Sequence, residues 1–411
     1  MKGIDSVDVS DKFKPGYEHV KGGLFDTVEK ADVGNGIIKM MKDGVTLLCW
    51  ADPFFPEPST PEFIKETAHK VIDSGEDIHY TMPVGRLSLK ERIAQKMNKK
   101  GYSLDPSRNI IITPGADAGL FFAMFPFIAP GDEVLVHDPS YPNNFQNVTL
   151  MGGTLVRVPL KKSEGYALNA DEFEKRITSK TKMVVLTNPN NPTSTVFRKK
   201  EIEDLCRIIV KHDLILVVDQ AFEDILYDGL EMTEAALLPG MWERTLVVCS
   251  TSKGMGLSGY RVGYIVAQDG IMDKLYGSAV AVIGTSNTLA QICAEAAYEN
   301  DEFVDAYKEI FDRRRKYLYE KMNRVPGVSM IMPESSFLAW VDVSALGESG
   351  EVVQYLAKEA KCLVNDGNNY GEQGAGHIRI VFGCLKDDGL LFDAIDRIAE
   401  ALGRYSERST P

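Results

Sequence analysis

The chain has 411 residues, of which 44% are hydrophobic and 26% charged, a composition that excludes a single small module and an intrinsically disordered protein. Its 46 basic and 59 acidic residues give a formal net charge of -13, which argues against nucleic acid and anionic membranes as partners. The N-terminus lacks the apolar segment of a signal peptide, and no apolar run approaches the roughly 20 residues of a membrane span. We therefore expect a soluble, cytoplasmic protein. Neither the cysteines nor the histidines have metal-ligand spacing, so we expect no metal.

Short apolar runs alternate with amphipathic stretches in the middle of the chain. Six β-branched runs predict strands, at 109–113, 133–137, 183–187, 214–219, 245–250 and 262–267. Between two of them, residues 199–212 carry Ile202, Leu205, Ile208 and Ile209 at helical spacing. Nearly continuous apolar strands separated by helices are typical of a mostly parallel sheet covered on both faces.

The pattern changes beyond residue 287. Residues 286–325 are charged and periodic, which predicts one long helix or a pair of helices. Two further strands are predicted at 337–343 and 377–382, followed by a last helix from about residue 388. We expect an N-terminal segment (1–55) that joins a small C-terminal domain (296–411), with a large α/β domain (56–295) between them.

Chemically useful residues follow five of the predicted strands. Ligands of parallel sheets bind beyond the carboxyl ends of the strands. These positions hold Gly115 and Ala116 at the start of a helix, Tyr141, the run NPNNPT at 188–193, Asp219, and the run STSK at 250–253. Taken singly, each has a structural explanation, such as a turn, a helix cap or a surface lysine. Taken together, they predict a pocket for a flat, anionic ligand that contains nitrogen.

The run GMGLSG at 254–259 has the glycine spacing of a dinucleotide-binding fingerprint. That fingerprint requires the glycines to open a helix whose N-terminus meets the pyrophosphate. Here the third glycine leads into the strand predicted at 262–267. We therefore do not predict a nucleotide site.

The run STSK at 250–253, followed by GYRVG at 259–263, resembles the pyridoxal-phosphate lysine signature of the class I/II aminotransferases of fold type I. The similarity covers about residues 45–400 and keeps the family's order of motifs, which are Tyr80, Gly85, Gly115, Tyr141, Asn191, Asp219, Lys253, Arg261 and Arg379. The resemblance implies an aspartate-aminotransferase-like fold. Its large domain would contain a seven-stranded, mostly parallel sheet, beside a smaller α+β domain. It also implies a homodimer with shared active sites.

The resemblance assigns catalytic and ring-binding roles. Lys253 would form an imine with the pyridoxal aldehyde and then move the α-proton of the substrate. Asp219 would keep the pyridine nitrogen protonated, so that the ring withdraws electrons. Asn191 would donate to the 3-oxygen of the ring, and Tyr141 would stack on its face.

The same resemblance assigns the anion-binding residues. The cofactor phosphate would lie on the N–H groups of Gly115 and Ala116 at a helix N-terminus. Ser250 and Arg261 would complete this phosphate site, and Tyr80 would reach it from the second subunit.

The substrate site follows from the same family comparison. Arg379 would bind the α-carboxylate of the substrate through two parallel hydrogen bonds, with Asn191 and the backbone of Ala51 beside it. No basic residue is identifiable as a partner for an acidic side chain. The candidate wall residues favour aromatic or large neutral amino acids, and they are Phe54, Phe55, Phe222 and Tyr370.

Four residues depart from the family pattern. Phe222 stands where tyrosine is usual, which removes a hydrogen-bond donor to the ring 3-oxygen. Ala51 and Ser194 each replace a usual glycine, and Asp117 places a carboxylate in the phosphate loop, which must point away from a phosphate.

The main hypothesis is a pyridoxal-phosphate-dependent aminotransferase that acts on an L-amino acid and a 2-oxo acid. Phe222 motivates an alternative, which is a lyase, a decarboxylase or an oxidative enzyme that uses the same cofactor. A third hypothesis is a non-catalytic ligand-binding protein, but the presence of Lys253 disfavours it.

Overall fold

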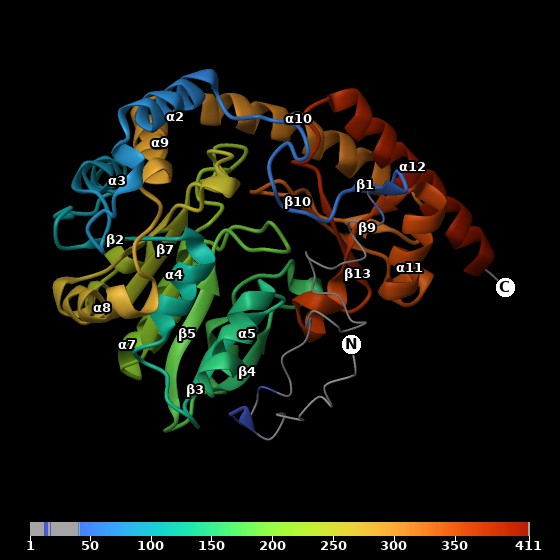
Figure 1. Ribbon diagram of the computed structural model, residues 1–411. Coiled ribbons are helices and arrows are strands. Elements are labelled where there is room, and N and C mark those ends of the chain that lie inside the picture. Colours follow the sequence, from blue (N-terminus) through green and yellow to red (C-terminus); the bar gives the residue numbers. More distant parts are fainter. Residues whose placement is uncertain (1–11, 15–16, 18–39, 41, 410–411) are drawn as a thin grey trace, which may run out of the picture.

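The centre of the molecule is a seven-stranded sheet (Figure 1). The computed structural model describes residues 12–14, 17, 40 and 42–409. The strands are β2 (Ile110–Thr113), β3 (Glu133–Asp138), β4 (Thr154–Pro159), β5 (Thr181–Thr187), β6 (Ile215–Asp219), β7 (Thr245–Ser250) and β8 (Gly263–Val266). Their order is β2-β8-β7-β6-β5-β3-β4, and β8 alone in this sheet runs antiparallel to its neighbours. The expected mostly parallel sheet is confirmed.

The strand β4 was not among the six runs predicted from apolar sequence. It lies at the sheet edge, where most of its side chains are only half buried, and it carries Arg157. An edge strand whose side chains are largely half buried lacks the continuous apolar run of a central strand, which explains the miss.

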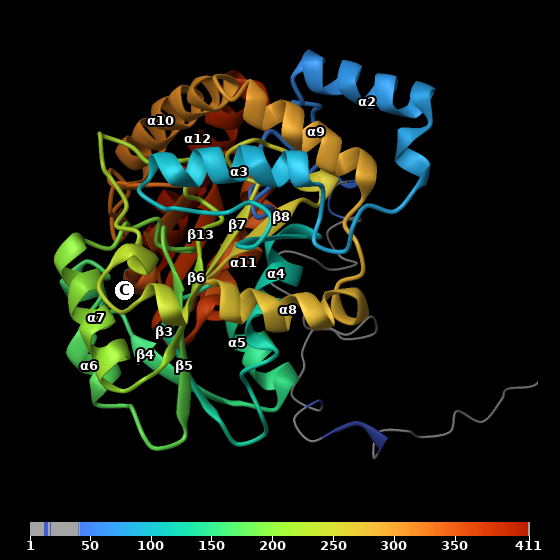
Figure 2. The same ribbon diagram turned by 90° about the vertical axis from the view of Figure 1, so that its left-hand side faces the viewer.

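Helices cover both faces of this sheet. One face packs against α4 (Gly115–Met124), α5 (Pro142–Met151) and α8 (Asp269–Val282). The other packs against α3 (Leu87–Lys99), α6 (Ala170–Glu174), α7 (Lys199–Lys211) and α9 (Thr288–Glu299), with α2 (Glu62–Ser74) lying on α9. Successive residues of β3 alternate between these cores, since Val134 and Val136 join the first and Leu135 the second. Figure 2 shows α3 and α8 on opposite sides of the strands.

A smaller α+β region lies beside the large sheet (Figure 1). Its four-stranded sheet has the order β12-β13-β10-β9. The strands are β9 (Ser329–Met330), β10 (Leu338–Asp342), β12 (Asn365–Asp366) and β13 (His377–Val381). Three helices accompany them, α10 (Phe303–Met322), α11 (Ser349–Tyr355) and α12 (Asp388–Ser409). The side chains of Phe311, Leu338, Ile378 and Ile395 share one buried core there.

The N-terminal part of the described chain contacts this smaller region. Strand β1 (Thr46–Leu47) pairs in parallel with β11 (Cys362–Leu363). Most of the first forty residues of the predicted segment 1–55 lie outside the described residues, so the boundaries 1–55, 56–295 and 296–411 stay a prediction. Among the described helices, none combines the length and the apolar character needed to cross a membrane.

Candidate active site

A cleft of about 390 Å³ opens at the carboxyl ends of the central strands. The residues that follow β2, β3, β5, β6 and β7 meet there, as expected from the parallel sheet. The segment after β1 and the strand β13 supply the rest of the wall. The lining consists of Trp50, Ala51, Asp52, Ala116, Asp117, Leu120, Tyr141, Asn191, Asp219, Ala221, Phe222, Ser250, Ser252, Lys253, Ser258, Gly259, Arg261 and Arg379.

Lys253 lies in the loop after β7 and is half buried. Its Nζ donates a hydrogen bond to the carbonyl oxygen of Ala51 at 2.5 Å. The same Nζ lies 5.9 Å from the centroid of the Phe222 ring. The amine is therefore held inside the cleft, between the N-terminal segment and the wall formed after β6.

Asp219 ends β6 and is buried at the floor of the cleft. Its Oδ1 accepts a hydrogen bond from the N–H of Ala221 at 3.0 Å. The pKa of Asp219 is raised to about 7, mainly by burial and in smaller part by the nearby carboxylate of Asp117, while the Ala221 N–H and the charge of Lys253 oppose the rise. A buried carboxylate of this kind is stabilised by a cation that reaches its free oxygen.

The N-terminus of α4 forms a narrow, electropositive corner. Gly115 has φ +83°, and a Cβ on it would lie 2.4 Å from the guanidinium of Arg261. A Cβ on Gly263 would lie 2.8 Å from the backbone nitrogen of Ala116. Only glycines allow β8 and Arg261 to approach the first turn of α4 this closely. Backbone N–H groups and a guanidinium thus face one space, a donor set that suits a phosphate.

The loop after β7 completes this corner. The Oγ of Ser250 accepts the N–H of Ser252 at 3.0 Å, and Nη1 of Arg261 donates to the carbonyl of Ser258 at 2.9 Å. The 3-10 turn of residues 258–260 leads into β8, not into a helix. This explains why the glycine run at 254–259 does not build a dinucleotide site.

Arg379 is fully buried on β13. Its Nε and Nη2 both donate to Oδ1 of Asn365, at 3.0 and 2.7 Å. Its Nη1 donates to Oδ1 of Asn191 at 3.0 Å, and Nη2 also donates to the carbonyl of Cys49 at 3.0 Å. The guanidinium lies over the ring of Tyr370, 4.8 Å from its centroid. These contacts hold the guanidinium plane in one orientation at the cleft wall.

One departure from the family pattern, Ser194, has a local explanation. Ser194 has φ +60°, the left-handed conformation in which glycine is usual. Its Oγ lies 2.6 Å from Oγ of Ser336 and donates to the carbonyl of Leu338 at 2.8 Å, which compensates for the strained backbone. Ala51 is buried and its carbonyl oxygen accepts the hydrogen bond from Lys253, so the backbone at this position faces the cleft.

Several expected residues lie elsewhere. Tyr80 is 94% exposed and does not line the cleft of the single chain. Of the four expected wall residues, only Phe222 lines it. The expectation was wrong for the other three, since Phe54 packs against Phe311 at 5.2 Å between ring centroids, Phe55 stacks on Trp50, and Tyr370 lies beneath Arg379.

Sequence reasoning missed Asn365, which orients Arg379. The two residues are paired across β12 and β13 in the short antiparallel ladder. No motif surrounds Asn365, so only the strand register reveals its role. Asp52, which lines the cleft and accepts a hydrogen bond from Ser258, could have been found as the polar neighbour of Ala51.

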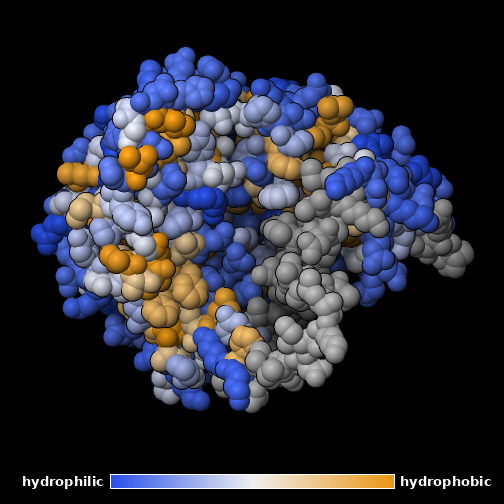
Figure 3. All heavy atoms as spheres, viewed as in Figure 1, coloured by the Kyte–Doolittle hydropathy of each residue, from blue (hydrophilic) through white to orange (hydrophobic). Residues whose placement is uncertain are grey.

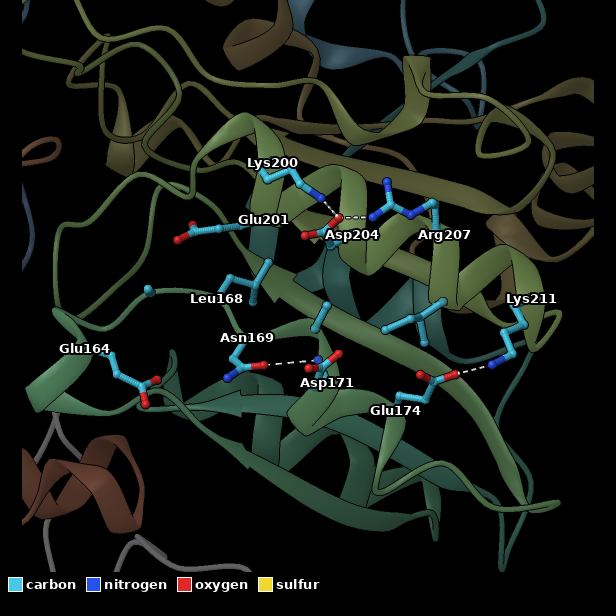
Figure 4. A pocket seen from close by; sticks show the side chains of 13 residues that line it. Glu164, Leu168, Asn169, Asp171, Glu174, Lys200, Glu201, Asp204, Arg207 and Lys211 are labelled. Atoms are coloured by element: carbon cyan, nitrogen blue, oxygen red, sulfur yellow. Dashed lines mark hydrogen bonds and ion pairs between the residues drawn. The ribbon is translucent and has the colours of Figure 1, made fainter.

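A second hollow, of about 560 Å³, lies between α6 and α7 (Figure 4). It shares no lining residue with the cleft. Its basic side chains pair with acidic neighbours, Lys200 and Arg207 with Asp204, and Lys211 with Glu174. The described part of the chain contains no cluster of His, Cys, Asp and Glu that could hold a metal ion.

The family model of "Aminotransferase class I and II" matches residues 43–398. The chain belongs to this family. The aromatic-amino-acid aminotransferase 2 of Thermococcus litoralis is 31% identical over 376 residues, which cover 90% of this chain and 94% of that protein. The aspartate aminotransferase of Pyrococcus abyssi is 32% identical over 352 residues, which cover 84% and 90%.

Solved structures agree with this assignment. The aromatic aminotransferase from Pyrococcus horikoshii superposes with a TM-score of 0.82 at 28% identity, covering 90% of this chain and 99% of that one. The aspartate aminotransferase from Thermus thermophilus with maleate gives a TM-score of 0.82 at 28% identity, covering 89% and 94%. The expected family, its fold and its aminotransferase function are confirmed, and the lyase, decarboxylase and oxidative alternatives are not favoured.

Proposed function

We propose that this aminotransferase uses pyridoxal 5'-phosphate to move an amino group between an L-amino acid and a 2-oxo acid, with Lys253 and Asp219 as its catalytic residues. The observation that carries this proposal is their meeting in one cleft with the glycine-lined corner of α4 and the buried guanidinium of Arg379. When bound, the cofactor supplies a carbonyl carbon that accepts the amino group and a ring that withdraws electrons from it.

The residues of the cleft fit this cofactor. The backbone N–H groups of Gly115 and Ala116, with Ser250 and Arg261, would hold the phosphate, because all four surround the corner at the start of α4. Tyr141 and Asn191 would contact the ring.

Asp219 would hold the pyridine nitrogen protonated. The carboxyl is buried and takes part in no ion pair among the described residues, and burial raises its pKa to about 7. A protonated ring nitrogen at this place would stabilise the carboxylate and lower its pKa again. The buried acid and the cofactor cation therefore stabilise each other.

Lys253 would move the α-proton of the substrate. Its Nζ is the only amine that lines the cleft among the described residues, and its hydrogen bond to the carbonyl oxygen of Ala51 keeps it directed inward. An amine at this place can take a proton from one atom of a bound substrate and return it to another.

Arg379→Lys is expected to raise the KM for the amino donor about 10- to 100-fold, or about 1.4–2.8 kcal/mol. Lysine cannot present two parallel N–H groups to the α-carboxylate, nor can it keep all the bonds to Asn365, Asn191 and Cys49. Steady-state kinetics test this. Arg313→Lys is the matched control, because Arg313 pairs with Asp388 on the surface and lies outside the cleft. An unchanged KM in Arg379→Lys would show that Arg379 does not bind the α-carboxylate of the substrate.

Phe222→Tyr is expected to lower the pH at which the bound cofactor changes its absorbance and to leave the reaction type intact. Phe222 is buried beside Lys253 and packs edge-on against Phe337, with ring centroids 5.4 Å apart. A phenol there would donate to the ionised ring oxygen and so stabilise the deprotonated state. A spectral pH titration measures the shift.

Product analysis of the same two proteins separates amino-group exchange from redirected chemistry. Keto acid without ammonia or peroxide is expected from both. Ammonia or peroxide from the wild type, lost in Phe222→Tyr in favour of amino-group exchange, would mean that the phenylalanine redirects the reaction.

Under the same proposal the enzyme is a homodimer with shared active sites, in which Tyr80 of one subunit completes the phosphate site of the other. Large apolar side chains remain exposed around Tyr80, namely Ile72, Ile78, Met82 and Leu87. Phe125, which directly follows α4, is exposed as well, and so are Tyr276 and Val280 on α8. Figure 3 shows hydrophobic residues gathered over α3, α4 and α8. A patch of this kind is typical of a surface that another chain covers.

The direct test is a spectral titration of the purified holoenzyme against the common amino acids. Conversion of the bound cofactor to its aminated form by an amino acid, reversed by a 2-oxo acid, is expected. A chain that binds the cofactor but shows no conversion with any amino acid would contradict the proposal.

A further inference from the structure

A cluster of charged side chains lies largely buried behind the cleft, where α3 covers the large sheet. Its cations are Lys96 and Lys100 of α3, and its carboxylates are Glu223, Asp224 and Glu234. None of the five lines the cleft, and the proposed function uses none of them. Charged groups that are removed from water need partners, so each member of the cluster depends on the others.

Glu223 is the centre of this cluster. Its side chain is 1% exposed, and its two carboxylate oxygens contact different lysines. Oε1 accepts a hydrogen bond from Nζ of Lys96 at 2.9 Å, and Oε2 accepts one from Nζ of Lys100. The hydroxyl of Tyr264 on β8 also donates to Oε1, at 3.2 Å. Burial acts to raise the pKa of Glu223, but Lys100 and Lys96 outweigh it and hold the pKa well below its ordinary value.

Two neighbours of this carboxylate in the sequence join the same cluster. Nζ of Lys96 also donates to Oδ1 of Asp224 at 2.6 Å, and Nζ of Lys100 also pairs with Glu234 at 3.3 Å. Nε2 of Gln220 donates to Oε2 of Glu234 at 2.9 Å. Three side chains of the segment 220–224, which we call the network turn, are therefore tied to α3, two of them directly.

The other side of the network turn faces the cleft. Asp219 directly precedes the turn at the cleft floor, and Phe222 within the turn lines the cleft wall. The backbone closes the turn, since the N–H of Glu223 donates to the carbonyl of Gln220 at 3.0 Å and that of Ile225 to the carbonyl of Phe222 at 3.0 Å. Two successive side chains thus point to opposite sides, one into the cleft and one toward α3.

The network turn also touches the loop that carries Lys253. A Cβ on Gly254 would lie 2.5 Å from Cβ of Asp224, so Asp224 packs directly on this glycine. On the cleft side, Nζ of Lys253 lies 5.9 Å from the centroid of the Phe222 ring. A rotation of the turn would therefore displace Phe222 and the Lys253 loop together.

We propose that Glu223 is a positioning residue whose ion pairs with α3 hold the network turn and thereby keep Phe222 and Lys253 in one arrangement beside the cofactor. The inference rests on the proposed function, because it concerns the amine that this function makes catalytic. Buried ion pairs add little stability compared with apolar packing, but breaking one is costly, so each charge keeps its partner and the geometry is fixed. A misplacement of about 1 Å at a reacting group can cost about a hundredfold in rate.

Glu223→Gln tests the inference, because it keeps the shape of the side chain and an acceptor for Tyr264 but removes the charge. Hydrogen exchange of the cofactor-free protein is expected to become at least about tenfold faster in peptides that cover 219–225. In the holoenzyme, the single-turnover rate of the amino-acid half-reaction is expected to fall at least about tenfold. The probe is the common amino acid that converts the wild-type cofactor fastest. Its KM should change less than about threefold, since Arg379 is held by other segments.

A double variant separates positioning from charge balance. Lys100→Met combined with Glu223→Gln removes one charge of each sign, so two cations and three carboxylates become one and two, and the net charge of the cluster is unchanged. It is expected to fold and to show the fast exchange and slow half-reaction of Glu223→Gln. Asp388→Asn is the control, since it breaks an ion pair with the buried Arg314 outside the cleft. It should change neither the exchange at 219–225 nor the half-reaction.

Three results would overturn the inference. A wild-type rate in the double variant would show that Glu223 only balances the charge of the lysines. A slow half-reaction without faster exchange at 219–225 would show that the turn is not what Glu223 holds. An equal slowing in Asp388→Asn would reduce the effect to general loss of stability. In each case a wild type that converts the cofactor leaves the proposed function intact, whereas no conversion by any amino acid would contradict that function and this inference with it.

Discussion

Lys253→Ala is expected to lose the covalent, borohydride-reducible bond between protein and cofactor and at least about a thousandfold in turnover, or about 4 kcal/mol. Lys253 is the only lysine that lines the cleft in the described part of the chain, so no neighbour can replace its amine. Alanine also leaves the Ala51 carbonyl without this donor. Mass spectrometry after borohydride reduction measures the adduct, and steady-state kinetics measure the turnover.

Lys274→Ala provides the control for this experiment. Lys274 is exposed on α8 and pairs with Asp273, so its removal should leave both the adduct and the turnover unchanged. A stable reduced adduct in Lys253→Ala would refute the assignment and point to another lysine.

Asp219→Asn is expected to slow proton abstraction by well over tenfold, which corresponds to more than about 1.4 kcal/mol, while the cofactor still binds. Asparagine has nearly the same shape as aspartate but no charge to keep the ring nitrogen protonated. Single-turnover kinetics of the amino-acid half-reaction measure this step. A smaller loss would mean that the carboxylate only caps the turn at Ala221, to which it is bonded.

The same substitution is expected to change the stability of the cofactor-free protein in a pH-dependent way. The folded protein holds the proton of Asp219 up to about pH 7, whereas the unfolded chain releases it near the ordinary value of 3.8. The free energy of unfolding should therefore fall as the pH rises between these values, by about 4 kcal/mol in total. The Asn variant has no proton to release and should lack this fall.

Urea denaturation of the cofactor-free proteins checks the sign. Near pH 4 the two proteins should have similar stability, and near pH 8 the Asn variant should be the more stable. Addition of pyridoxal phosphate should raise the free energy of unfolding of the wild type more than that of the variant. A wild type whose stability rises over this pH range, relative to the variant, would show that Asp219 already has a cation beside it.

The sequence by itself determined the large-scale plan and most of the cleft. The short, largely apolar runs at 133–137 and 183–187 predict strands covered on both faces, and parallel strands bring their carboxyl ends to one edge. Asp219, Lys253, Asn191 and Tyr141 therefore had to meet once the strands were recognised, because each follows its strand directly. Local pattern and fold agree at these positions.

Only the tertiary structure decided which residues from distant parts of the sequence complete the cleft. Asn365 faces Arg379 because of the register between β12 and β13, and the Ala51 carbonyl meets Lys253 across more than two hundred residues. Phe54 and Tyr370 are aromatic and were therefore candidates for the wall of the substrate site. The packing of the smaller region buries both behind the cleft surface. Strand register and side-chain packing depend on contacts between distant segments, and no local pattern of residues encodes them.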